Sequence, residues 1–184
     1  APRELPRRSA QTAIHRIATD LARLLAPIGS FTAEEVWQHL PRAPGGPASV
    51  FLSGLPAADP ALDDEELLDR WTRLRAVRSE VTRAIEDVRR AGRLGHSLDA
   101  AVTLRAAGPR LELLRAYAAS LAEVFIVSSV ALEERTGGGE ELEVVVEPAT
   151  AEKGGRCWNR REDVGRDAAR PDVCGRCATV LAGL

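Results

Sequence analysis

The longest amphipathic pattern in the sequence runs from Leu62 to Ala91 and predicts a long helix. Apolar residues recur there at spacings of three and four, which place them on one helical face. Acidic residues fill its first turn, and Arg89 and Arg90 lie at its end, as the helix dipole favours. The fold is therefore expected to be built around this helix. Its predicted inward residues are Leu67, Leu68, Trp71, Leu74, Val77, Val81, Ile85 and Val88.

Two further helices are predicted before it. The first runs from Ser9 until Pro27 and Gly29 stop or kink it, and it carries one apolar stripe. The second begins at a capping box made by Thr32 and Glu35 and ends before Pro41. The stripe of the first helix consists of Ile14, Ile17, Leu21, Leu24, Leu25 and Ile28, and the second helix is expected to turn Val36, Trp37 and Leu40 inward.

A loop rich in proline and glycine is predicted over residues 41–60. It is expected to be held against the body by Val50, Phe51, Leu52 and Leu55.

After Gly92 and Gly95 the pattern changes to that of a small α/β unit. We predict strands at 101–104 and 142–146, a β-branched run at 124–132, a helix at 110–123, and a turn at 136–139 that joins the last two strands as a hairpin. The predicted fold class is mainly α with a small α+β part: a helical bundle segment, then a small sheet with helices, then a short cysteine knuckle tail. The predicted domains are 1–58, 59–147 and 148–184.

The composition is that of a soluble globular protein, with 45% hydrophobic and 28% charged residues. No apolar run approaches the roughly 20 residues that cross a bilayer, and no signal peptide is recognisable, so we expect a cytoplasmic protein without membrane contact. The net charge of −2 means that any nucleic-acid binding must rest on local patches. The chain has no methionine and starts at Ala1, which suggests the C-terminal piece of a longer protein.

Three cysteines near the end of the chain have the spacing of an incomplete zinc site. Cys174 and Cys177 form one Cys-x-x-Cys turn, and Cys157 can supply a third thiolate. The position three residues before Cys157 holds Gly154, so the fourth ligand would have to be water or one of three aspartates. These candidates are Asp163, Asp167 and Asp172. The alternatives are a knuckle that no longer holds metal and, less favoured because the segment is short and polar, a catalytic zinc with an open position.

Trp158, Arg160 and Arg161 place a flat ring beside two guanidinium groups, and Arg176 lies between the last two cysteines. Such a group can stack on an unpaired base and pair with phosphates, which predicts RNA binding. The alternative is that Trp158 packs the knuckle against the body while the arginines pair with neighbouring acids. The arginines of the long helix are interpreted as a solvated face. No nucleophile with an evident base stands out, so the residues indicate no active site.

The order of these motifs resembles the class I aminoacyl-tRNA synthetases for branched aliphatic amino acids, and among them the isoleucyl-tRNA synthetase family of bacteria. The residues that carry the resemblance are "RRSAQTAIHRIATDLARLLAPIGSFTAEEVWQHLP" with "SVFLSGLP", then "WTRLRAVRSEVTRAIEDVRRAGRLGHSLDAAVTL" with "FIVSSVAL", and finally "RCWNRREDVG" with "RPDVCGRC". The last group is similar to that family's zinc-binding tail. Gly154 departs from the family's first cysteine pair, and Arg170 stands where a histidine is often found.

The resemblance implies the end of a helical anticodon-binding domain, a C-terminal junction and a zinc-finger-like tail that bind an isoleucine-accepting tRNA. It also implies a monomeric ligase whose ATP site, catalytic domain and editing domain lie outside this segment. The zinc ligands would be Cys157, Cys174 and Cys177. Another hypothesis is a stand-alone RNA-binding or interaction module derived from such a C-terminus, and a third is a free-standing zinc hydrolase.

Overall fold

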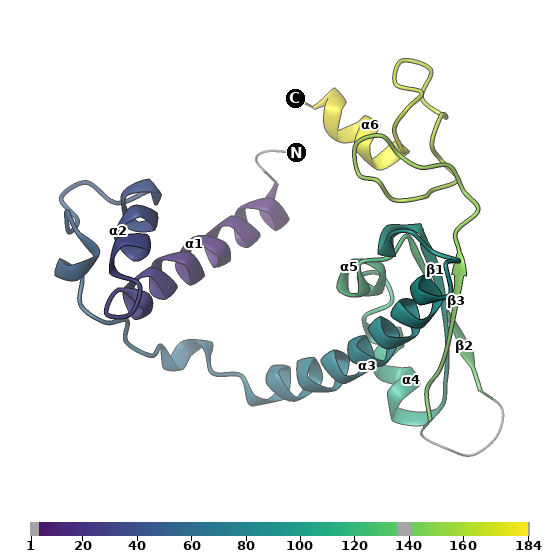
Figure 1. Cartoon of the computed structure of the whole chain (residues 1–184), viewed down its shortest axis with the longest axis horizontal. Helices are drawn as coiled ribbons and strands as arrows, with labels where there is room; N and C mark the ends of the chain where they lie inside the picture. Colours follow the sequence, from purple (N-terminus) through teal and green to yellow (C-terminus); the bar gives the residue numbers. More distant parts are fainter. Residues whose placement is uncertain (1–3, 136–140, 184) are drawn as a thin grey trace. The chain divides into compact units, whose positions relative to one another are not determined.

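The computed structural model describes residues 4–135 and 141–183, and these form two compact units, the first ending at Asp63 and the second beginning at Asp64. The mainly helical fold class with a small sheet is confirmed (Figure 1). The helices are α1 (Leu5–Leu25), α2 (Ser30–His39), α3 (Glu65–Arg90), α4 (Gly108–Ala116), α5 (Leu121–Phe125) and α6 (Gly175–Ala182). The strands are β1 (Ala100–Ala106), β2 (Ser129–Glu134) and β3 (Glu143–Pro148). No described helix is long and apolar enough to span a membrane.

The first unit packs α1 against α2 around a small core. Helix α2 begins at Ser30, two residues before the predicted start, because the carbonyl of Gly29 already accepts from the N–H of Ala33. Thr32 therefore lies inside the helix, and the predicted capping box is wrong. Of the residues expected to point inward, Trp37 is buried and Val36 is exposed. The core residues are Ala22, Ala26, Ala33, Trp37 and Val50.

Polar contacts hold the loop of the first unit, and apolar anchors do so only at Val50. The expected anchors Phe51, Leu52 and Leu55 are exposed, so that prediction is wrong. The carboxylate of Glu34 accepts hydrogen bonds from the Ser49 hydroxyl and the Val50 N–H. The Arg23 guanidinium donates to three loop carbonyls, those of Ser53, Gly54 and Leu55. Such bonds satisfy loop backbone groups without requiring the neighbouring apolar side chains to be buried.

Helix α3 organises the second unit. The Asp64 carboxylate accepts from the Leu67 N–H at 2.8 Å and so caps the helix at its start. The predicted inward face is buried from Leu74 onward, whereas Leu68 is exposed. The long helix is thus confirmed, but its first turns do not contribute to the core. The buried residues of α3 are Leu74, Val77, Val81, Ile85 and Val88.

The sheet has the strand order β2-β1-β3, with β2 parallel and β3 antiparallel to β1. Val102 of β1 lies between Val130 and Val146, so the central strand is covered by aliphatic neighbours on both sides. The predicted hairpin is wrong, because β1 separates the two strands that it would have paired. The turn predicted at 136–139 lies outside the described residues.

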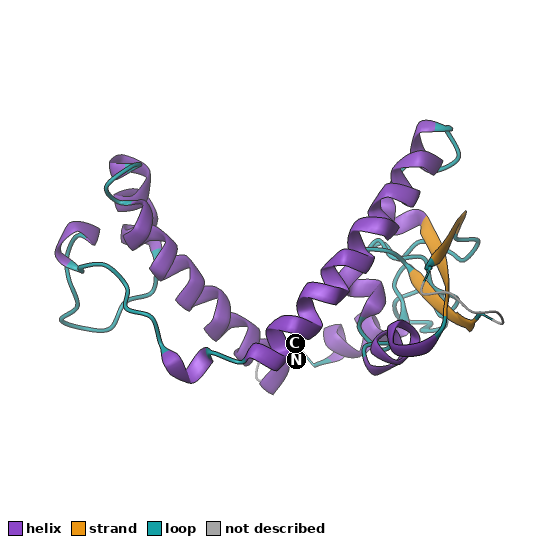
Figure 2. Ribbon diagram, turned by 90° about the horizontal axis from the view of Figure 1, so that it is seen from below, coloured by secondary structure: helices purple, strands orange, loops and turns teal. Residues whose placement is uncertain are grey.

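Helices lie along one face of this sheet, as Figure 2 shows. Residues of β1 alternate between buried and half-buried, as expected for a sheet that is covered on one side only. The predicted helix at 110–123 is in fact two, because α4 ends at Ala116 and α5 starts after Ser120. The predicted β-branched run at 124–132 begins with the end of α5, and its strand starts only at Ser129.

Candidate metal centre and nucleic-acid interface

The three cysteines come together as the sequence predicts. The sulfur atoms of Cys157, Cys174 and Cys177 all lie within 4.8 Å of one another, and the Sγ atoms of Cys157 and Cys174 are 3.7 Å apart. Tetrahedral zinc–sulfur bonds of about 2.3 Å place neighbouring sulfurs about 3.8 Å apart. The spacing therefore fits zinc, and these three residues would hold it.

Two short elements position the sulfurs. A tight turn presents Cys157: the Gly154 N–H donates to the Asn159 carbonyl at 2.9 Å, and the Trp158 N–H donates to the Gly154 carbonyl at 2.8 Å. Trp158 has a left-handed φ of 62°, unusual for a large side chain and required by this turn. On the other side, Cys174 is the residue before helix α6, which places Cys177 in the first turn of that helix. The sequence signal for α6 is short, and we did not predict it.

The surroundings of the thiols separate their pKa values. Burial acts to raise the pKa of Cys157, but hydrogen bonds from Asn159 and from the other two cysteines outweigh burial and lower it. At Cys174, burial and the neighbouring thiols raise the pKa, although the backbone N–H of Cys177 acts against them. Cys157 is thus the first of these two thiols to become the thiolate that a metal requires.

Gly154 lies beside Cys157 in the cysteine cluster. A Cβ atom at this position would come within 3.2 Å of Cys157 Sγ, so a side chain there would start beside that sulfur. Among the described residues, the group of close metal-ligating atoms contains no carboxylate, which argues against the three aspartates as the fourth ligand. Asp163 caps α6 instead, because its Oδ2 accepts from the Gly175 N–H at 3.0 Å.

Arg160 ties the tail to the sheet. Its Nε donates to Asp99 Oδ1 at 2.8 Å, and its own N–H donates to the Ser128 hydroxyl. Lys153 Nζ lies 3.8 Å from the same Asp99 oxygen. Burial acts to raise the pKa of Asp99, but the hydrogen bond and charge of Arg160, together with the charge of Lys153, hold it below its usual value. Sequence patterns give no signal for this pair, because its members are far apart in the chain.

The other predicted RNA-contacting residues lie on the surface. The side chain of Trp158 is 60% exposed, which contradicts the alternative that it packs the knuckle against the body. Arg161 Nε lies 3.5 Å from Asp163 Oδ1, as the alternative for the arginines expected, although this buried oxygen accepts no hydrogen bond. Arg176 forms an exposed ion pair with Glu123. An exposed ring beside arginines in weak ion pairs remains available to a ligand.

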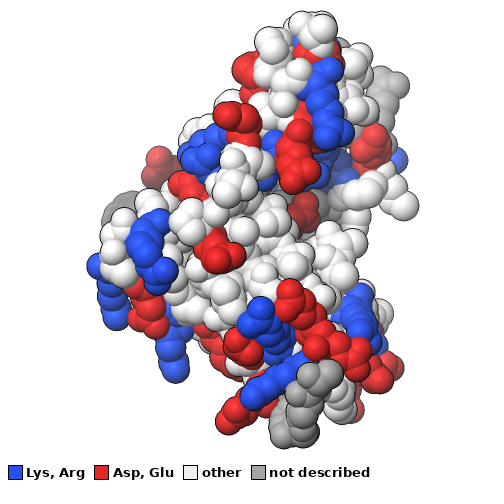
Figure 3. All heavy atoms as spheres, turned by 90° about the vertical axis from the view of Figure 1, so that its right-hand side faces the viewer, with Lys and Arg blue, Asp and Glu red and all other residues white. Residues whose placement is uncertain are grey.

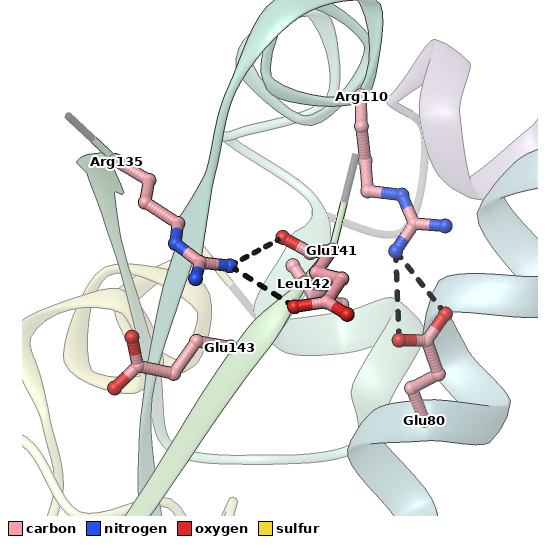
Figure 4. Close-up of a pocket in the computed structure, with 6 residues that line it drawn as sticks. All are labelled: Glu80, Arg110, Arg135, Glu141, Leu142 and Glu143. Carbon is pink, nitrogen blue, oxygen red and sulfur yellow. Dashed lines mark hydrogen bonds and ion pairs between the residues drawn. The ribbon is translucent and has the colours of Figure 1, made fainter. Parts of the chain in front are cut away.

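A hollow of about 640 Å³ lies between α3, the start of α4 and the start of β3 (Figure 4). Its charged groups are all in ion pairs: Arg110 binds the Glu80 carboxylate, and Arg135 binds Glu141. Glu143 pairs with Arg105 of the neighbouring strand. Since these pairs use the charges that line it, the hollow does not resemble a catalytic site.

Comparison with known proteins gives two family matches. Residues 1–104 match the family described as "Anticodon-binding domain of tRNA ligase". Residues 155–180, which contain all three cysteines, match the family described as "Zinc finger found in FPG and IleRS". The first match spans more than half of the chain. The chain therefore belongs to the family of anticodon-binding domains of tRNA ligases.

Three proteins that are similar to this chain are named isoleucine–tRNA ligase. The protein from Bordetella petrii is 45% identical over 97% of this chain, and that from Carboxydothermus hydrogenoformans is 44% identical over 97%. The protein from Geobacter sulfurreducens is 41% identical over 95% of this chain. The matched regions make up 19%, 20% and 20% of these relatives, so the chain spans about a fifth of their length.

Proposed function

We propose that this chain is the tRNA-binding C-terminal region of an isoleucine–tRNA ligase. The observation that carries the proposal is the succession of two matches along one chain, an anticodon-binding domain at 1–104 and a zinc finger at 155–180. In this proposal the chain contacts an isoleucine-accepting tRNA. ATP is used by the catalytic domain of the parent enzyme, a cytoplasmic monomer whose editing domain also lies outside this segment.

The proposed role of zinc is structural. Bound by Cys157, Cys174 and Cys177, the metal would join the turn at 154–159 to the start of α6 and so fix the orientation of Trp158. This role is supported by the sulfur spacing and by the zinc-finger match. The free energy of metal binding contributes to folding in such small modules, so the tail should lose order without it.

Metal analysis tests the zinc proposal. Protein expressed with added zinc should hold about one zinc per chain, because three thiolates and one further ligand complete a tetrahedron. Cys177→Ser should lower the zinc content, and Gly154→Cys should slow zinc loss to a chelator by adding a thiolate beside Cys157. A zinc content well under one in the unmutated protein contradicts the proposal.

Binding of a fluorescent isoleucine tRNA transcript tests the RNA proposal. Trp158→Asn is the informative variant, since asparagine tolerates the left-handed backbone of this position and removes the ring. Loss of one stacked base costs about 1–3 kcal/mol, which corresponds to roughly a 5- to 150-fold weaker affinity. Trp158→Phe is the control that keeps an aromatic ring. Equal affinity of the Asn variant and the unmutated protein contradicts the stacking role.

Within a whole ligase that contains this chain, the same Asn variant should slow aminoacylation of tRNA far more than isoleucine-dependent ATP–pyrophosphate exchange. Equal loss in both assays would contradict a role confined to tRNA. A stand-alone module, the second candidate, predicts a start codon near Ala1 in the gene, whereas the ligase predicts a continuous upstream reading frame.

A further inference from the structure

One face of helix α3 carries arginines without partners. Arg75, Arg78 and Arg83 are exposed and line one hollow on the helix surface, where Arg78 flanks the buried stripe of Leu74 and Val81 and Arg83 lies opposite it. In the part of the chain that the structure describes, none of the three guanidinium groups makes an ion pair or a hydrogen bond with another residue. These three residues are called the α3 arginine face below.

Other arginines of the same helix have acidic partners one turn away. Arg70 pairs with Glu66 and Arg73 with Asp69, and Arg89 pairs with Glu86. Such pairs at spacings of three and four residues are what a solvated helix surface normally shows. The solvated face predicted for Arg70, Arg73, Arg75, Arg78 and Arg83 therefore divides into a paired group and an unpaired one.

The sequence denies the α3 arginine face such partners. No acid lies three or four residues from Arg75 or Arg78, and these two are themselves spaced by three, so their like charges repel. Arg83 has acids at both spacings, but the structure uses them elsewhere, since Glu80 pairs with Arg110 and Asp87 with Arg90. The repulsion between these exposed like charges is relieved when an anionic ligand binds to them.

The surface around these arginines is hollowed and polar. A shallow hollow of about 560 Å³ is lined by the three arginines and by Ser79 and Thr82. Its C-terminal end is formed by Glu86, Asp87 and Arg90, all of which are in ion pairs of the helix itself. An acidic protein partner would need an apolar centre to its interface, and this hollow has none. On the face of the molecule that Figure 3 shows, by contrast, positive and negative side chains are interspersed.

We propose that the α3 arginine face binds the phosphate backbone of an RNA strand. Guanidinium groups and hydroxyls are the donors that contact phosphates without reading sequence. From Arg75 to Arg83 the helix rises about 12 Å, which matches roughly three to four nucleotides of a strand at about 3.4 Å each. The inference rests on the proposed function, and it assigns tRNA contacts to a surface outside the cysteine tail.

The test measures binding of the whole 184-residue chain to a fluorescent isoleucine tRNA transcript over a series of salt concentrations. The test variant is Arg75→Ala/Arg78→Ala/Arg83→Ala. The matched control is Arg70→Ala/Arg73→Ala/Arg89→Ala, which removes the same charge from the same helix but only from paired arginines. Circular dichroism should show unchanged helicity in both, since these side chains are exposed and alanine favours helices.

The test variant should bind roughly tenfold or more weakly at moderate salt, and the slope of log affinity against log salt should fall by about two to three. The control should lose much less affinity. Unmutated protein that does not bind tRNA would overturn the proposed function itself. Normal binding by the test variant, or an equal loss in the control, would overturn the arginine face alone. The arginine face would also be overturned if polyglutamate displaced tRNA from the unmutated chain as effectively as an RNA of equal charge.

Discussion

Helices α1 and α3 carry apolar stripes of the same kind, but only that of α3 is buried, from Leu74 onward. Leu74 and Val81 of α3 are fully buried, whereas Ile14 and Ile17 of α1 are 65% and 58% exposed. Both stripes follow the same spacing of three and four. Periodicity therefore identifies the apolar face of a helix, whereas burial of that face depends on whether another element covers it.

The packing within each unit explains why the two stripes differ in burial. Helix α3 packs against the sheet, and its buried residues share one large core with Val102 and Leu104 of the central strand. Helix α1 contacts α2 through Ala22, with Ala26 just beyond its end, about a third of a turn away from its apolar stripe. Small residues allow close approach of the helices, and the larger aliphatic side chains remain on the outer side.

The largest effect is expected from matched truncations in the two stripes. Leu74→Ala leaves a cavity in a filled core and should lower the free energy of unfolding of the second unit by about 2–5 kcal/mol. Leu21→Ala, at a half-exposed position, should cost about 1 kcal/mol or less. Urea unfolding, monitored by hydrogen exchange of the amides of α1 and of α3, measures the stability of each unit separately. Equal losses would break the comparison.

Removal of Asp99 should have a smaller effect, because it releases the tail and leaves the core of the second unit intact. Asp99→Asn loses its charge-assisted bond to Arg160, which is only partly buried, and should cost about 1–2 kcal/mol. Hydrogen exchange of residues 150–165 should rise, while that of β1 should stay low. Unchanged exchange in the tail would contradict this docking role.

The same residue predicts a pH dependence. Since the folded-state pKa of Asp99 lies below its unfolded value of about 3.9, its stabilisation is present above that value and is lost as the pH falls through the folded pKa. Protection of the tail amides, corrected for the intrinsic pH dependence of exchange, should therefore fall below about pH 4 in the unmutated protein. In Asp99→Asn this acid-dependent step should be absent.

Substitutions at the starts of α3 and α2 should change the free energy of unfolding by about 1 kcal/mol or less. Asp64→Ala removes the side-chain cap of α3 and should cost about 1 kcal/mol, whereas Gly29→Ser can add a cap that α2 lacks and should gain a few tenths. Thermal unfolding of the two variants gives the sign of each change. Shifts of the same sign would contradict the assignment of the caps.

The smallest effect is expected at the exposed end of the α1 stripe. Ile28→Ser at a position that is 85% exposed should change the unfolding free energy by about 0.5 kcal/mol or less. A loss of more than about 2 kcal/mol in the unfolding free energy would mean that this stripe is covered in solution. The control is Val50→Ser, which introduces a hydroxyl into the small core and should be clearly destabilising.

The features that could be predicted from the sequence are those that local interactions produce. The existence of α1, α2, α3 and β1, the acidic start of α3 and the Cys174–Cys177 turn depend on residues close together in the chain, so pattern and spacing reveal them. The family resemblance has the same origin, since it rests on contiguous motifs.

Features that depend on residues far apart in the chain are visible only in the folded structure. It placed β1 between β2 and β3 where the sequence suggested a hairpin, left the α1 stripe uncovered, and paired Arg160 with Asp99. It also divided the arginines of α3 by giving Glu80 to Arg110 of another helix. Each of these outcomes is a competition between possible partners far apart in the chain, and local periodicity carries no information about which partner wins.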